Sequence, residues 1–118
     1  MSYELVFYET RFGRAPALEF LRRQPKPVRA EAGWMLEQLQ KSGDNMGRPG
    51  AAYLDDGISE LRLQVERNEY RLLFFFSGQQ IVVVTHGFSK KTQRVPKAEI
   101  ERARELRAEW LSRFGGTR

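Results

Sequence analysis

The clearest pattern along the chain is an alternation of apolar and polar residues over 58–66. Leu61, Leu63 and Val65 are separated by single polar residues, a period of two that is typical of a strand with one buried face. Two further apolar runs follow after short polar turns, in residues 70–76 and 81–88. Three strands joined by such short connections must run antiparallel to one another as a meander.

Helical periodicity precedes these strands. A short apolar helix is predicted from about Pro16, because the missing N–H of proline is harmless in a first helical turn. After a break at 24–30, a longer helix is predicted, with Gly43 placed to cap its C-terminus. The apolar residues of this second helix recur on one face, at Val28, Ala32, Met35, Leu36 and Leu39. The two helices are expected to form a hairpin that packs on one face of the sheet.

The two ends of the chain complete the predicted order. A final helix is predicted after Pro96, ending at the Gly115–Gly116 pair. Its apolar stripe consists of Ile100, Ala103, Leu106, Trp110 and Phe114. The aromatic run YELVFY at 3–8 predicts a first strand, and Tyr53 with Leu54 predicts a brief strand before the turn at 55–57.

The major elements therefore follow the order β-α-α-β-β-β-α, with no internal repeat. We expect one α+β domain spanning residues 1–118. In this domain an antiparallel sheet carries the N-terminal helical hairpin on one face, and the C-terminal helix completes the layer.

Composition excludes several classes of protein. A chain of 118 residues with 41% hydrophobic and 30% charged residues has the composition of a globular domain. No run approaches the ~18 apolar residues of a membrane span, and the N-terminus lacks the pattern of a secretion signal. There is no cysteine, and a single histidine leaves little material for a transition-metal site. We expect a cytoplasmic protein that uses no metal and no cofactor.

The net charge of +5 comes entirely from the second half of the chain. Residues 1–59 contain eight Lys and Arg against eight Asp and Glu, whereas residues 60–118 contain twelve against seven. Seven of these cations lie in the segment that holds the predicted strands, namely Arg62, Arg67, Arg71, Lys90, Lys91, Arg94 and Lys97. Such an excess indicates a polyanionic partner, with nucleic acid the first candidate.

Strand alternation predicts that some of these cations share one face of the sheet. If the helical hairpin covers the face that receives Leu61 and Leu63, Arg62 points to the opposite face. Arg71 can join Arg62 there from the neighbouring strand. The end of the last strand brings further polar residues to the same edge, namely Lys90, Lys91 and Gln93. Guanidinium and ammonium groups clustered in this way suit the binding of a phosphate.

Each candidate also has a purely structural interpretation. Arg71 interrupts an apolar run, where an unpaired guanidinium is costly, so a carboxylate such as Glu60 or Glu66 is its expected partner. An arginine that alternates outward from a strand, such as Arg62, is usually just solvated. His86 is more readily explained as a packed histidine that donates to a backbone carbonyl than as a catalytic group.

Four sequence segments together resemble a known group of proteins. They are GISELR at 57–62, EYRLLFFF at 69–76, IVVVTHGFSKKTQRVP at 81–96 and EIERARELRAEW at 99–110. In this order they resemble the RelE/ParE superfamily of bacterial toxins, most closely its HigB-type, phage-protein-like branch. The predicted first strand and helical hairpin also match the RelE-like fold of that superfamily.

The resemblance implies the toxin of a two-gene toxin–antitoxin module. Toxins of this kind typically cleave messenger RNA on the translating ribosome without a metal, through attack of the RNA 2′-hydroxyl on the adjacent phosphate. A cognate helix-turn-helix antitoxin is the implied partner, in a hetero-oligomer with the toxin. The branch that inhibits a DNA topoisomerase shares the fold, so a non-catalytic inhibitor is an alternative. A prophage relic that retains only antitoxin binding is another.

The resemblance also implies roles for residues of this chain. Arg62 matches a basic position on a strand, Arg71 matches an arginine that grips the scissile phosphate, and the Lys90–Lys91 pair matches a general acid or charge stabiliser. His86 is the remaining catalytic candidate. Further RNA contacts are expected from Arg67, Gln93, Arg94 and Lys97. The chain departs from several relatives because it has neither tyrosine nor histidine after Lys91, where they place an acid or base.

Overall fold

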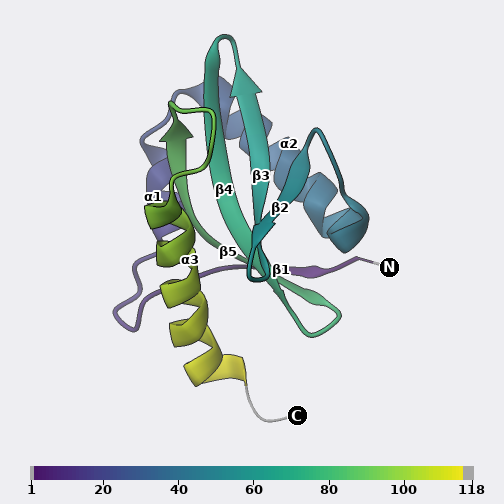
Figure 1. The fold of residues 1–118 in the computed structure, drawn as a ribbon, viewed down its shortest axis with the longest axis vertical. Helices are drawn as coiled ribbons and strands as arrows, with labels where there is room; N and C mark the ends of the chain where they lie inside the picture. The colour runs from purple at the N-terminus through teal and green to yellow at the C-terminus, as the bar shows by residue number, and fades with distance from the viewer. Residues whose placement is uncertain (1, 116–118) are drawn as a thin grey trace.

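A mixed five-stranded sheet forms the centre of the fold, in the order β1-β5-β4-β3-β2 (Figure 1). The computed structural model describes residues 2–115. The strands are β1 (Glu4–Phe7), β2 (Ala51–Asp55), β3 (Ile58–Val65), β4 (Asn68–Ser77) and β5 (Ile81–Lys90). β3, β4 and β5 form the antiparallel meander that the short turns predict. The brief strand predicted at Tyr53 and Leu54 is β2, which extends this sheet by pairing antiparallel with β3.

β1 departs from the predicted antiparallel arrangement because it runs parallel to β5. It pairs from Glu4 opposite Ile81 to Phe7 opposite Val84, at the edge of the sheet. A short turn forces the strands that it joins to run antiparallel, but β1 is connected to the next strand through two helices. Its direction is therefore set by packing and not by a turn.

Two strand boundaries differ from the predicted ones because the turns that join the strands have only two residues. Asp56 and Gly57 join β2 to β3 with positive φ angles of 51° and 79°, the conformation that tight hairpins require. Glu66, with φ of 57°, and Arg67 join β3 to β4. The predicted turn at 67–69 is therefore shorter, and Glu69 belongs to β4. β5 likewise continues to Lys90, two residues beyond the predicted end.

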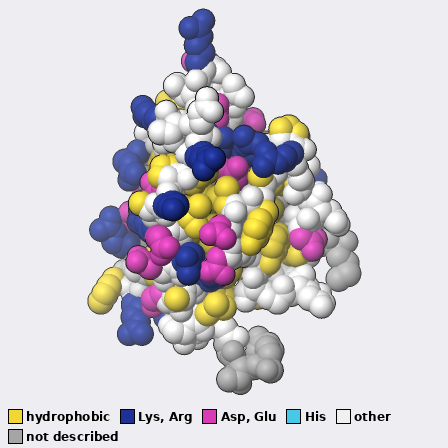
Figure 2. All heavy atoms as spheres, viewed as in Figure 1, with side chains coloured by type: hydrophobic (Ala, Val, Ile, Leu, Met, Phe, Trp, Pro, Cys, Tyr) yellow, Lys and Arg dark blue, Asp and Glu magenta, His cyan; other side chains and the backbone are white. Residues whose placement is uncertain are grey.

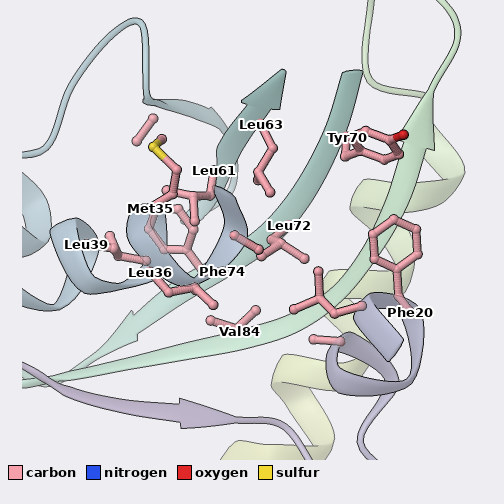
Figure 3. Close-up of a cluster of buried hydrophobic side chains, with 14 of the residues drawn as sticks. Phe20, Met35, Leu36, Leu39, Leu61, Leu63, Tyr70, Leu72, Phe74 and Val84 are labelled. Atoms are coloured by element: carbon pink, nitrogen blue, oxygen red, sulfur yellow. The ribbon is translucent and has the colours of Figure 1, made fainter. Parts of the chain in front are cut away.

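The helical hairpin covers one face of the sheet, as predicted. α1 (Pro16–Arg22) and α2 (Lys26–Ser42) contribute the apolar sides identified in the sequence, and Gly43 caps α2 with φ of 56° before a 3₁₀ turn (Gly43–Asn45). The core between helices and sheet includes Phe20, Met35, Leu36, Leu39, Leu61, Leu63, Tyr70, Leu72, Phe74 and Val84 (Figure 3). Leu61 and Leu63 thus face the hairpin, which leaves Arg62 on the opposite face.

α3 (Lys97–Trp110) covers part of that opposite face and continues as a wider helical turn (Leu111–Gly115). A second hydrophobic core lies between α3 and the sheet and consists of Tyr8, Ile58, Leu73, Phe75, Val83, Ala103 and Trp110. Phe114 was predicted on the apolar stripe but is largely exposed, and Gly116, the second residue of the predicted helix end, lies outside the described residues.

Arg104 and Arg107 pair with Asp56 at 3.0 and 3.1 Å and fix α3 to the β2–β3 turn. The β3–β4 hairpin extends beyond α3 (Figure 1).

Candidate functional site

The face of the sheet that α3 only partly covers carries two rows of polar side chains near its free end. Arg62 of β3 lies directly opposite Arg71 of β4, and Glu69 of β4 lies directly opposite Lys90 of β5. Directly opposed residues on neighbouring strands have Cβ atoms about 4.5–5.5 Å apart and share a face. The register therefore places the two arginines side by side, as strand alternation predicts, with Lys90 one row further along.

Arg71 is buried, with 2% of its surface exposed, and each nitrogen of its guanidinium donates a hydrogen bond. Nε donates to Glu60 Oε1 at 2.9 Å, one terminal nitrogen donates to Glu69 Oε1 at 2.9 Å, and the other donates to the Tyr70 carbonyl at 3.0 Å. The prediction that a carboxylate pairs with Arg71 is confirmed for Glu60. The second carboxylate partner is Glu69 and not Glu66. Glu69 is the more exposed of its two carboxylate partners, so a phosphate that approaches from solvent competes with Glu69 for this guanidinium.

Arg62 is the more accessible of the two arginines, with 31% of its side chain exposed. Its ion pair among the described residues is a longer contact of 3.6 Å from Nε to Glu60 Oε2. Glu60 is buried and lies between the two guanidinium groups, which it holds through their Nε atoms. The contact of Arg62 with Glu60 is longer than a hydrogen bond, and the exposed part of the side chain leaves the guanidinium of Arg62 available to an anionic ligand.

Glu69 is a member of this site that sequence reasoning missed. Its hydrogen bond and charge interaction with Arg71, followed by the charges of Lys90 and Arg62, hold the pKa of its carboxyl below the ordinary value. Glu69 was assigned to a turn, but strand alternation places it two residues before Arg71 on the same face. That spacing was the signal that could have identified it.

Arg67, Lys90 and Lys91 meet around a groove of about 570 Å³ at the free end of the sheet. Arg67 is at the tip of the β3–β4 hairpin, and Lys90 ends β5. Lys90 Nζ donates to the Thr92 carbonyl at 2.6 Å, which folds the chain after β5 back toward the groove. We refer to Arg62, Arg67, Arg71, Lys90 and Lys91 as the basic patch.

The other predicted RNA contacts lie outside the basic patch. Gln93, Arg94 and Lys97 are exposed, in the loop after β5 and at the start of α3, and they do not line the groove. Lys and Arg side chains gather over the upper part of this face, around the ends of β3, β4 and β5 (Figure 2). Arg94 and Lys97 therefore add to the local positive field, Gln93 is uncharged, and none of the three forms part of the groove itself.

His86 is buried, with 1% of its surface exposed, and lies beneath the first turn of α3. Nε2 is 2.9 Å from Glu99 Oε1, and Nδ1 is 3.1 Å from Thr85 Oγ1. An ionised Glu99 requires the tautomer with its proton on Nε2. This is a packed histidine, as the structural interpretation expected, but its partners are side chains and not a backbone carbonyl. Burial lowers the pKa of His86, against the opposing effect of the Glu99 hydrogen bond.

Lowering the pH below about 6.5 is expected to destabilise the fold through His86. The folded ring resists protonation, whereas the unfolded chain binds a proton at the ordinary pKa of 6.5. Since the unfolded state binds more protons, the free energy of unfolding falls by up to about 1.4 kcal/mol per pH unit. The fall begins at the unfolded pKa and stops at the lowered folded pKa.

Urea unfolding of the wild type and of His86→Gln at pH 7.5, 6.5 and 5.5 measures this effect. The variant keeps a neutral donor toward Glu99 but cannot titrate, so its stability should change less over this range. The carboxyls with lowered pKa, Glu19, Glu69 and Glu109, lose their contribution only below about 4.5 and do not interfere. Equal pH dependence in both proteins would contradict the assignment.

Within residues 2–115, no group of three or more His, Cys, Asp or Glu side chains is arranged to hold a metal ion. None of the helices in the same range combines the length and apolar character needed to cross a membrane.

Comparison with known proteins gives two related matches. Residues 19–108 match the family described as phage derived protein Gp49-like (DUF891). The chain is also 42% identical over 60 residues to proteins named probable endoribonuclease HigB1 in two strains of Mycobacterium tuberculosis, CDC 1551 and H37Rv. That alignment covers 51% of this chain and 47% of each relative, so the chain spans about half the length of the curated relatives it matches. Both matches confirm the resemblance that the sequence motifs indicate.

Proposed function

Since the chain belongs to the phage-derived Gp49-like family, we propose that it is the toxin of a toxin–antitoxin module and cleaves messenger RNA on the ribosome. Cleavage would stop translation, and the protein would act in the cytoplasm. The similarity to proteins named as probable endoribonucleases supports the cleavage, since that name describes the proposed reaction.

The observation that carries the proposal is the arrangement of the basic patch. Arg62 and Arg71 are directly opposed on β3 and β4, and Lys90 lies one row away on the same face. A guanidinium held by a buried carboxylate is a rigid donor, and a lysine at the strand end is a mobile one. This combination supports a site for a phosphodiester, in which charge develops on the phosphate oxygens during cleavage.

The proposed reaction needs no group outside the RNA to form the new bond. The 2′-oxygen attacks the adjacent phosphorus, the bond from phosphorus to the 5′-oxygen breaks, and the products are a 2′,3′-cyclic phosphate and a 5′-hydroxyl. Water accepts the proton of the 2′-hydroxyl, and the 5′-oxygen receives a proton from a lysine of the basic patch or from water. Arg62 would stabilise the charge on the non-bridging oxygens, and Lys90 or Lys91 would stabilise or protonate the departing 5′-oxygen.

The side chains near the patch are poorly suited to act as a general base. His86 is buried beneath α3, and Glu69 has a lowered pKa, which makes it a weak base at neutral pH. The proposed catalysis therefore depends mainly on positioning of the RNA and stabilisation of charge. These effects suit an enzyme whose substrate is held by a second particle such as the ribosome.

Addition of the purified protein to a translation extract tests the proposal. A reporter message should acquire new 5′-hydroxyl ends within its coding region, and these can be mapped by primer extension. A matched message without its start codon should remain intact, because it is not translated. Cleavage of both messages would contradict the dependence on the ribosome.

The alternatives give different results in parallel assays. Blocked DNA supercoiling with intact messenger RNA would overturn the nuclease in favour of a topoisomerase inhibitor. Binding to the antitoxin with neither effect would identify a relic of the module. We propose a helix-turn-helix protein as that antitoxin, and the positive charge of the patch favours a partner that covers it with acidic residues.

A further inference from the structure

A hollow of about 610 Å³ lies beside the basic patch, at the edge of β3. We call it the Trp34 hollow. Its walls come from α2, from the loop between α2 and β2, and from the ends of β3 and β4. Its lining includes Trp34, Met35, Gln38, Met46, Arg62 and Gln64. Its volume falls in the range of about 300–1,000 Å³ that is usual for small-ligand sites.

Trp34 is the exposed aromatic residue of this hollow. It shows 57% of its surface to solvent, although it lies on α2 directly before the buried Met35. The apolar stripe of α2 does not include Trp34, so the packing of the hairpin does not explain a tryptophan at this position. An accessible indole offers a flat surface on which a nucleobase can stack.

The floor of the hollow is apolar. Met35 and Met46 bring their terminal methyl groups together against Gly50, where an added Cβ would lie 3.0 Å from each of them. Glycine at 50 therefore allows the loop to close over the two thioethers. Thioether side chains are polarisable and pack well against aromatic rings, so this floor suits the lower edge of a planar base.

The walls supply polar groups that can recognise the edge of a base. Gln38 of α2 and Gln64 of β3 each carry an amide that both donates and accepts. The Arg62 N–H donates to the Gly50 carbonyl at 2.8 Å, at the end of the pairing between β2 and β3. Within residues 2–115 no strand pairs with the β2 side of β3 beyond this point, so the backbone groups of Gln64 on that side face the hollow.

Arg62 connects the hollow to the basic patch, because it lines the hollow and lies opposite Arg71. We propose that the Trp34 hollow binds one nucleobase of single-stranded RNA, stacked on Trp34, while Arg62 holds the phosphate of the same or the next nucleotide. This inference rests on the proposed function and adds to it a residue that determines where the RNA is cut. Two carboxylates, Glu31 and Glu69, also line the hollow. Their negative charge favours a base whose edge is rich in N–H donors and disfavours a second phosphate.

Binding of an uncleavable RNA tests the site separately from catalysis. The probe is a fluorescein-labelled hexanucleotide with 2′-O-methyl groups, which lacks the attacking hydroxyl, and the readout is fluorescence anisotropy. Trp34→Ala should bind it about 5- to 150-fold more weakly, the equivalent of ~1–3 kcal/mol of base stacking. Trp34→Phe should retain most of the affinity. Phe12→Ala is the matched control, because Phe12 is 94% exposed and does not line the hollow.

A second readout uses the intrinsic fluorescence of Trp34. The chain has two tryptophans, and Trp110→Phe leaves Trp34 as the remaining one. The hexanucleotide should quench its emission, whereas inorganic tripolyphosphate, which has charge but no base, should not. Equal quenching by both probes, or equal hexanucleotide affinity in Trp34→Ala and the wild type, would overturn the inference.

Cleavage maps separate failure of this inference from failure of the proposed function. If the wild type cuts translated messages and Trp34→Ala cuts the same positions at the same rate, the function stands and the base site is refuted. If the wild type cuts nothing but the hexanucleotide binds in a manner that depends on Trp34, the site stands and the nuclease is refuted. A changed set of cleavage positions in Trp34→Ala supports both.

Discussion

Replacement of Arg71 with methionine is expected to destabilise the fold by about 3–5 kcal/mol. The substitution leaves the Glu60 carboxylate buried without the guanidinium that lies 2.9 Å away, and Glu60 is only 5% exposed. The remaining contact of Glu60, 3.6 Å to Arg62, is too long to compensate. A typical domain has only about 5–15 kcal/mol of stability, so this loss is a large fraction of the total. Urea unfolding followed by circular dichroism measures it.

A double variant provides the matched control for this prediction. In Glu60→Leu/Arg71→Met both charges are removed together, and replacement of a buried ion pair by apolar residues is often nearly neutral. The double variant should therefore be more stable than Arg71→Met alone. Glu69→Gln, which changes the partly exposed partner of Arg71, should cost less than about 1 kcal/mol. A single variant as stable as the wild type would show that the pair is not buried in solution.

The stability effect decides how activity data on Arg71 are interpreted. A loss of cleavage in Arg71→Ala could come from unfolding as readily as from a lost phosphate contact. Arg71 is therefore a poor residue for a direct test of catalysis, although the family resemblance assigns it the central role. The neighbouring arginine is better suited.

Replacement of Arg62 with alanine is expected to reduce ribosome-dependent cleavage about 100- to 1,000-fold, the usual effect of removing one preorganised donor to developing charge. Arg62 is partly exposed, and its ion pair within residues 2–115 is the long contact to Glu60, so the fold should lose less than about 1 kcal/mol. Glu60 keeps its close partner Arg71 in this variant. Initial rates of cleavage in the translation extract and urea unfolding of the same preparation measure the two effects.

Arg14→Ala is the control for a general loss of positive charge. Arg14 is exposed and pairs with Glu19 at 2.9 Å, outside the basic patch, so its removal changes the net charge by the same amount. Its cleavage rate should remain close to that of the wild type. If Arg14→Ala and Arg62→Ala lose activity equally, the cleavage depends on net charge alone, and Arg62 does not contact the phosphate.

Much of the fold could be inferred from the residues alone. The alternation around Leu61 and Leu63, the turn at Asp56 and Gly57 and the apolar stripe of α2 are local patterns, and local patterns specify elements and their faces. The placement of Arg62 opposite the helical hairpin follows from the same period of two. The parallel direction of β1 could not be inferred, because no short turn connects β1 to its neighbour in the sheet.

The chemical state of the site required the tertiary structure. Arg71, Glu60 and Glu69 are identifiable as charged residues from the sequence, but their pairing depends on the register between β3 and β4 and on burial by surrounding elements. The partner of His86 likewise lies thirteen residues away on α3, and the choice of Glu99 depends on where that helix is placed.

The sequence alone therefore established the layers of the fold, the cationic face and the resemblance to a toxin family, because each depends on local periodicity or on short motifs. Only the tertiary structure showed that Arg71 is already paired with two carboxylates and that Arg62 is the more accessible arginine. It also showed that Trp34 and Arg62 line the same hollow. Those features arise from desolvation and from contacts between distant segments, which strand and helix periodicity do not encode.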